Sequence, residues 1–411
     1  MVKVYDNGLK LNIKKIDGLL SVTIGIMIKA GSTDENAQNN GISHFIEHMQ
    51  FKGTKTRTAF DITDSIDRIG AQINAFTSKE MTCYYVKSTT EHIEKGMEVL
   101  SDLFFNSVFD KQEIEREKGV IVEEINMVED TPEDICADLA IKAHYGAHPL
   151  GQTILGPIDN IKRFEKTDLK DYMKSMYTPD NTVISIAGNI DTDKACALVE
   201  KYFASNFKKA KKQDKKTSVF AGGNRQFLYR QKDIEQTHIS LIFPSCPFAS
   251  DINDQTLLLS TILGGGMSSR LFQTVREQMG LCYSIYSYQS GYTDSGVFSI
   301  SAGVNPEKAK VALDAIYAEI DKLKKCGIGN DEFLRAKEQM KGSLILSQES
   351  TSGQMVLYGR FLLFAGEEFD FDRKIKQINA VKKEDIEDLS HKLLDKAGMA
   401  AGYVSRQEVL K

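Results

Sequence analysis

The chain has 411 residues, 41% hydrophobic and 27% charged, a balance typical of folded proteins, and its length predicts two large domains or three small ones. A net charge of −5 argues against nucleic acid as the principal partner, because no excess of positive charge is available to hold phosphates. The longest apolar stretch, residues 19–28, is too short to cross a bilayer and the six cysteines are scattered singly, so we expect no membrane partner, free thiols and a cytoplasmic location.

In the first half of the chain, hydrophobic periodicity predicts strands and helices in a definite order. An apolar strand is expected at 19–30, then a helix at 41–51 and a hairpin at 72–88. The remaining elements are helices at 91–105, 111–129, 133–144 and 167–176 and a closing strand at 182–186.

The second half runs through the same order. Its expected elements are a strand at 237–244, a helix at 254–263, a hairpin at 281–303, helices at 306–325, 331–348, 355–364 and 383–394, and a strand at 400–404. This is an approximate duplication with a period of about 200 residues. We therefore expect two homologous domains, residues 1–212 and 222–411, joined by the lysine-rich stretch 208–224. Each should be α+β, an antiparallel-rich sheet with helices packed on one face.

The helix at 41–51 carries the most informative motif, H-x-x-E-H, formed by His44, Glu47 and His48. Residues four apart on a helix lie one above the other, so both imidazoles can hold one metal ion, and Glu47 lies on the same face. The order is the inverse of the zinc-peptidase motif H-E-x-x-H. The alternative is two histidines that fall four apart by chance, which is rare in a chain with seven histidines. An apolar stripe on the other face would pack on the core: Ile42, Phe45, Ile46 and Met49.

A catalytic zinc site needs a third protein ligand, and the helix at 111–129 offers several glutamates. Glu117 and Glu124 are seven residues apart and share a face, whereas Glu123 is rotated by about 100° from Glu124. The residues alone leave open whether Glu124 is a ligand or a solvated surface group. The second half has no H-x-x-E-H motif, so only the first half can carry the metal centre.

His44 and Glu47 also belong to a longer segment with a family resemblance. Residues 41–54, GISHFIEHMQFKGT, resemble the signature of the pitrilysin/insulinase family of zinc metallopeptidases, the inverzincins. The similarity is closest to bacterial members that resemble mitochondrial processing peptidase. Four more segments resemble further blocks of the family: residues 70–86, 115–132, 148–156 and 263–287. The resemblance therefore covers nearly the whole chain in the right order.

This resemblance implies a zinc-dependent endopeptidase that cleaves short or unfolded peptides inside a chamber closed by the two domains, as in a clamshell. One Zn²⁺ per chain would be held by His44, His48 and Glu124. Glu47 would be the general base for the attacking water, and Glu117 would orient a ligand or its helix.

From the second half, the resemblance implies that the Tyr283 hydroxyl stabilises the oxyanion and that Arg276 positions the substrate. The substrate backbone would pair with an edge strand formed by Asn74, Ala75, Phe76 and Thr77. The expected partners are peptide substrates and a second copy of the chain in a homodimer, with a heterodimer of related subunits as the other possibility. The alternative function is a non-catalytic or partner subunit of a processing-peptidase-like heterodimer.

A second pair of histidines, His144 and His148, is also four residues apart. Gly146 and Pro149 should break a helix there, which favours a loop near the substrate cleft over a second metal site.

Overall fold

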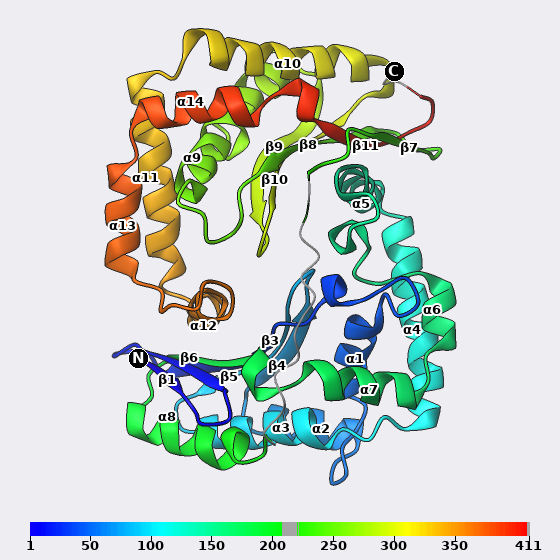
Figure 1. The fold of residues 1–411 in the computed structure, drawn as a ribbon, viewed down its shortest axis with the longest axis vertical. Coiled ribbons are helices and arrows are strands. Elements are labelled where there is room, and N and C mark those ends of the chain that lie inside the picture. The colour runs from blue at the N-terminus through cyan, green and yellow to red at the C-terminus, as the bar shows by residue number, and fades with distance from the viewer. Residues whose placement is uncertain (208–219, 221, 409–411) are drawn as a thin grey trace. The chain divides into compact units, whose positions relative to one another are not determined.

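The computed structural model describes residues 1–207, 220 and 222–408 and divides into two compact units (Figure 1). Of the described residues, the first unit takes those within 1–125, 152–217 and 347–369, and the second takes those within 126–151, 218–346 and 370–411. Each predicted half therefore supplies most of one unit and contributes one segment to the other. The basic run 208–216 of the predicted junction lies outside the described residues.

The first unit is built on a six-stranded sheet with the order β1-β2-β6-β3-β5-β4. Neighbouring strands are antiparallel except β2 and β6, which are parallel. The strands are β1 (Val2–Val4), β2 (Lys10–Lys15), β3 (Ser21–Ile28), β4 (Gln72–Thr77), β5 (Thr82–Thr89) and β6 (Thr182–Gly188). The helices of this unit are α1 (Ile42–Gln50), α2 (Ala59–Asp67), α3 (Ile93–Asn106), most of α4 (Lys111–Glu129), α6 (Ile158–Arg163), α7 (Lys166–Met176), α8 (Thr192–Val199) and α12 (Thr351–Arg360).

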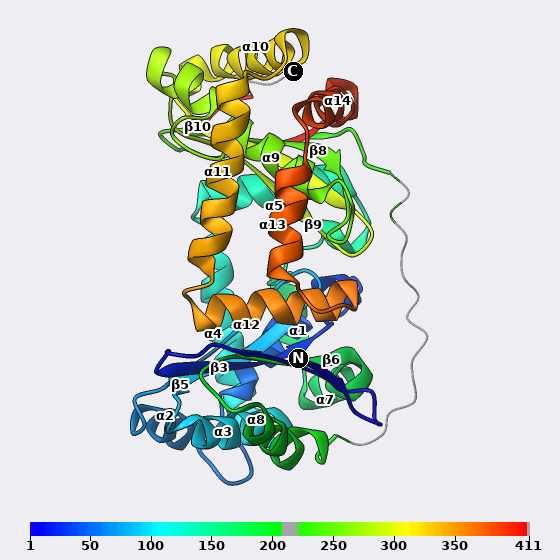
Figure 2. The ribbon, with the colours of Figure 1, turned by 90° about the vertical axis from the view of Figure 1, so that its left-hand side faces the viewer.

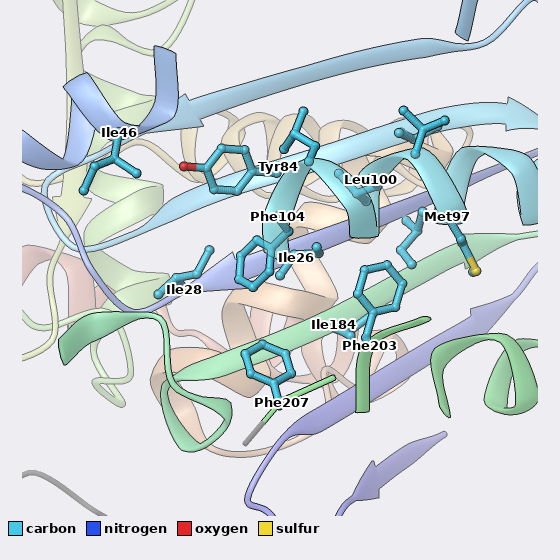
Figure 3. Close-up of a cluster of buried hydrophobic side chains, with 14 of the residues drawn as sticks. Ile26, Ile28, Ile46, Tyr84, Met97, Leu100, Phe104, Ile184, Phe203 and Phe207 are labelled. Atoms are coloured by element: carbon cyan, nitrogen blue, oxygen red, sulfur yellow. The ribbon is translucent and has the colours of Figure 1, made fainter. Parts of the chain in front are cut away.

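Strand β3 is buried along nearly its whole length because both faces of the sheet are covered. Ile24, Ile26 and Ile28 point into a large core shared with α1, α3 and α7, part of which is shown in Figure 3. Met27 points to the opposite face, where it packs with Met355 of α12. The first core fixes α1 against the sheet, and α1 carries the H-x-x-E-H motif.

The second unit is built on a five-stranded sheet with the order β7-β11-β8-β10-β9. Only β7 and β11 are parallel. The strands are β7 (Phe227–Gln231), β8 (Thr237–Ser245), β9 (Cys282–Gly291), β10 (Gly296–Val304) and β11 (Ala400–Ser405). The helices are α5 (Pro132–Tyr145), α9 (Asn253–Gly264), α10 (Ala309–Cys326), α11 (Asn330–Ser347), α13 (Phe371–Ala380) and α14 (Lys383–Leu393).

Each half of the chain contributes one helix to the unit built mainly by the other half. Helix α5, from the first half of the chain, packs on β11 and β8 of the second sheet (Figure 1). Helix α12, from the second half, packs on β3 and β6 of the first sheet (Figure 2). Glycines permit the close approach: a Cβ at Gly25 would lie 2.3 Å from the Met355 sulfur, and one at Gly402 would lie 2.3 Å from the Ala140 nitrogen.

The predicted fold class, two α+β domains with antiparallel-rich sheets, is confirmed. Most helices lie on one face of each sheet, and the exchanged helix covers the other face. Within the described part of the chain, no helix combines the length and the apolar character needed to span a bilayer.

Candidate metal centre

Helix α1 presents the motif because its other face is fully buried. Ile42, Phe45, Ile46 and Met49 are at most 2% exposed, and the Phe45 ring meets the Phe164 ring edge-to-face at 5.7 Å. With one face fixed in the core, the other face holds His44, Glu47 and His48.

The side chains of His44, His48 and Glu124 converge. The Nε2 atoms of His44 and His48 lie 3.6 and 3.4 Å from the same Glu124 carboxylate oxygen, Oε2, and the three ligand atoms all lie within 4.8 Å of one another. Ligand atoms about 2.0–2.1 Å from a tetrahedral zinc ion are separated by about 3.4 Å, so the 3.6 and 3.4 Å separations of the two histidines from Glu124 fit zinc. Two imidazoles and one carboxylate, with a fourth position left for water, are a donor set of catalytic zinc sites. Among the described residues, this is the only such cluster of histidine, cysteine and carboxylate groups.

The structure separates the two neighbouring glutamates of α4. Glu124 is partly buried and faces the histidines, whereas Glu123 is exposed. Of the two glutamates, Glu124 is therefore the one that lies beside the two histidines.

Glu117 lies behind His48 and is almost fully buried. Its Oε1 is 2.7 Å from His48 Nδ1, and its Oε2 is 2.7 Å from Lys52 Nζ. In the neutral ring, a carboxylate at Nδ1 holds the remaining proton on that nitrogen and leaves Nε2 free to bind a metal. Glu117 thus contacts His48 at the ring nitrogen that points away from Glu124.

The Glu47 carboxylate contacts Thr77, which the sequence analysis placed on the substrate-binding edge strand. The Thr77 hydroxyl of β4 donates a hydrogen bond to Glu47 Oε2, which fixes the carboxylate beside the histidines. Burial raises the pKa of Glu47, with the Thr77 hydrogen bond acting in the opposite direction. A raised pKa suits a general base at neutral pH. Thr77 follows Glu47 by 30 positions in the sequence, so no local pattern predicts their contact.

The surroundings shift the pKa values of the two histidines in opposite directions. Burial, reinforced by the His48 charge, lowers the pKa of His44 to about 4. Burial also opposes charge on His48, but hydrogen bonds to the Glu117 and Glu124 carboxylates outweigh it and raise the pKa of His48 to about 9.

We therefore expect metal-free His48 to keep its proton through neutral pH, and zinc affinity to rise as the pH rises toward 9, because zinc must displace that proton. Histidine resonances in an NMR pH titration of the metal-free protein test the first point, and chelator competition at several pH values tests the second. Titration of both rings near their ordinary value of about 6.5 would contradict this assignment.

Strand β4 forms one edge of its sheet. Its backbone pairs with β5, and no strand in the described chain pairs with its other side. Asn74 is exposed and accepts a hydrogen bond from the Ala75 nitrogen. This edge has main-chain groups that an extended peptide could join.

Arg276 and Tyr283 lie together in the second unit. The Arg276 guanidinium is 5.1 Å from the centre of the Tyr283 ring and 4.5 Å from that of Phe272, both within cation–π range. Arg276 belongs to a π-helical turn, Phe272–Gln278, and Tyr283 is 74% exposed on β9. The pair presents a phenol and a guanidinium to solvent.

As the predicted helix at 133–144 implies, and unlike His148 beyond the break at Gly146, His144 lies in a helix. It occupies the last turn of α5 and is fully buried beside Tyr145 and Phe220, and neither ring nitrogen has a hydrogen-bond partner among the residues that the structure describes. Burial lowers the pKa of His144 to about 4. The helix runs one residue beyond its predicted end at residue 144, and Gly146, with φ of 59°, forms the predicted break.

Comparison with known proteins gives matches along most of the chain. Residues 17–158 match the insulinase family (peptidase family M16), and residues 163–340 match the peptidase M16 inactive domain. The chain is 44% identical over 395 residues to the uncharacterized zinc protease YmxG of Bacillus subtilis (strain 168), covering 96% of each chain. It is 36% identical over 388 residues to an uncharacterized zinc protease of Rickettsia felis, covering 94% of this chain and 93% of that one.

Two solved structures share the fold. A protease from Helicobacter pylori has a TM-score of 0.90 at 24% identity, covering 98% of this chain and 99% of that one. A peptidase M16 inactive domain from Pseudomonas fluorescens has a TM-score of 0.92 at 20% identity, covering 100% and 98%.

Proposed function

Because this chain belongs to the insulinase family of peptidases, M16, we propose that it is a zinc-dependent endopeptidase acting on short or unfolded peptides. The observation that carries the proposal is the convergence of His44, His48 and Glu124 on one point, with Glu47 one helical turn from His44. The proposed ligand set would hold one Zn²⁺ per chain.

Bound zinc supplies a Lewis acid that activates water and polarises the scissile carbonyl. Glu47 accepts the proton of the attacking water and then delivers it to the nitrogen of the leaving amine. Thr77 holds the Glu47 carboxylate in place through its hydroxyl. Glu117 keeps His48 Nε2 directed toward Glu124, and Lys52 neutralises the Glu117 charge that this requires.

The substrate is proposed to add a strand to β4. Asn74, Ala75, Phe76 and Thr77 lie on this edge, and the last of them touches the general base, so a peptide paired there would pass beside Glu47. Strand addition needs an extended backbone, which favours unfolded or short peptides over folded proteins.

The second domain is proposed to close over the bound peptide. Tyr283 would then donate its hydroxyl to the oxyanion, and Arg276 would hold the substrate. Support comes from the exposure of Tyr283 and from its contact with Arg276, which limits the orientations of both side chains.

Tyr283→Phe is expected to lower kcat and leave the zinc content unchanged, because an oxyanion donor acts mainly in the transition state, at a cost of about 2.7–4 kcal/mol at its strongest. Arg276→Ala should mainly raise KM. Steady-state kinetics with metal analysis test both, with Tyr288→Phe, another tyrosine of β9, as the matched control. Unchanged kcat and KM in both variants would show that Tyr283 and Arg276 of the second domain take no part in the reaction.

A homodimer is the proposed assembly, with a related subunit as the alternative partner. A cytoplasmic location is proposed because all six cysteines are free. The alternative function, a non-catalytic subunit, is disfavoured because the chain has a complete set of proposed ligands and a base.

The experiment that tests the function is digestion of a mixed peptide library by the purified chain, with and without a zinc chelator. We expect cleavage that the chelator abolishes and added zinc restores. Absence of cleavage by zinc-loaded chain would favour the non-catalytic alternative.

A further inference from the structure

A buried carboxylate lies at the N-terminus of the motif helix. Glu35 is 5% exposed, and its two oxygens accept three hydrogen bonds from the start of α1. Oε2 accepts from the Asn40 side-chain nitrogen at 2.9 Å and from the Gly41 backbone nitrogen at 2.7 Å, while Oε1 accepts from the Ser43 backbone nitrogen at 2.8 Å. Ser43 directly precedes His44.

Glu35 replaces the cap that α1 cannot supply itself. The N-cap position is Gly41, which has no side chain to accept from the first-turn N–H groups. Glycine is needed there because φ is 100° and a Cβ would lie 2.5 Å from the Leu155 oxygen. The Glu35 carboxylate, six residues before Gly41, accepts from the Gly41 and Ser43 N–H groups instead. Its negative charge is favourable at the positive end of the helix.

Helix α1 is thus held by a buried carboxylate at each end. Glu117 contacts His48 and Lys52 near the C-terminus, and Glu35 contacts the first turn. Side chains on a helix project outward from its axis, with successive residues about 100° apart. A small rotation of α1 about its axis would therefore move the His44 and His48 nitrogens away from the point that they share with Glu124.

We propose that Glu35 is a positioning residue of the metal centre, which sets the rotation of α1 so that His44 and His48 meet Glu124. This inference rests on the proposed zinc site. It goes beyond stability, because a residue that merely stabilised the fold would not change the affinity of the folded protein for metal.

Glu35→Gln tests the proposal with almost no change of size. An amide has one acceptor oxygen and an N–H₂ group, so at least one of the Gly41 and Ser43 N–H groups loses its acceptor. The matched control is Asp191→Ala, which removes the carboxylate that caps α8 in the same unit, a helix without a proposed ligand.

We expect Glu35→Gln to weaken zinc binding by roughly 10–100-fold, the range for partners outside the ligand set, in competition with a chromophoric chelator. The visible spectrum of bound Co²⁺ should change, and first-turn amides of α1 should exchange hydrogen faster in the metal-free protein. Asp191→Ala should keep the wild-type zinc affinity and Co²⁺ spectrum.

A folded Glu35→Gln protein with wild-type zinc affinity and Co²⁺ spectrum would overturn this inference and leave the proposed function intact. A wild-type chain that binds no zinc would instead overturn the proposed function. Should Glu35→Gln not fold, Asn40→Ala takes its place, since it removes one of the three donors to Glu35. A smaller loss of zinc affinity is then expected, and an unchanged affinity would overturn the inference.

Discussion

Replacing Glu47 with glutamine is expected to abolish most peptide cleavage while leaving the zinc content unchanged. Glutamine has nearly the same shape, and its amide oxygen can still accept the Thr77 hydrogen bond, so the local geometry is kept. The amide cannot take a proton from the attacking water, and loss of a general base lowers kcat on the order of 10²-fold or more. Turnover of a fluorogenic peptide and metal analysis of the same preparation measure both quantities.

Thr77→Val serves as the companion variant, because it removes the hydroxyl that orients Glu47 but keeps the carboxylate. Its kcat should fall less than that of Glu47→Gln. If Glu47→Gln lost its zinc together with its activity, Glu47 would be supporting the metal centre, and the assignment as base would fail.

The second large effect concerns two adjacent glutamates on α4. Glu124→Gln should lose zinc affinity, by at least the roughly 10–100-fold typical of removing a partner outside the ligand set, because a neutral amide oxygen replaces a charged ligand. Glu123→Gln is the matched control: the same substitution one residue earlier, at an exposed position turned away from the histidines. Zinc dissociation constants of the two variants decide the comparison. Loss of zinc affinity in Glu123→Gln but not in Glu124→Gln would show that α4 turns Glu123, not Glu124, toward the histidines.

The proposed metal ligands were accessible from the sequence because each lies on a helix with a clear period. Helix α4 begins and ends at the predicted residues, and its seven-residue spacing puts Glu117 and Glu124 on one face. The choice of Glu124 over Glu123 needed the family resemblance or the structure. The proposed roles of Glu35 and Thr77 could not be predicted. Each depends on a hydrogen bond to another element, Glu35 to the start of α1 and Thr77 to Glu47, and no periodic pattern in the sequence indicates either bond.

Parts of the fold were missed for similar reasons. Strand β1 has three residues and β7 is half-exposed at the sheet edge, so neither has a strong apolar pattern. The exchange of α5 and α12 was also missing from the prediction. Periodicity shows which face of a helix is apolar, but the sheet that it covers depends on fitted surfaces such as Gly25 against Met355.

The central claim is that one zinc ion, held by His44, His48 and Glu124, makes this chain a peptidase. The most direct test is to remove all metal, add zinc stepwise, and follow bound zinc and peptide cleavage in the same sample. Both should rise together and level off at one zinc per chain, and His44→Ala should show neither rise. Cleavage by the metal-free chain, or equal zinc binding by His44→Ala and wild type, would contradict the claim.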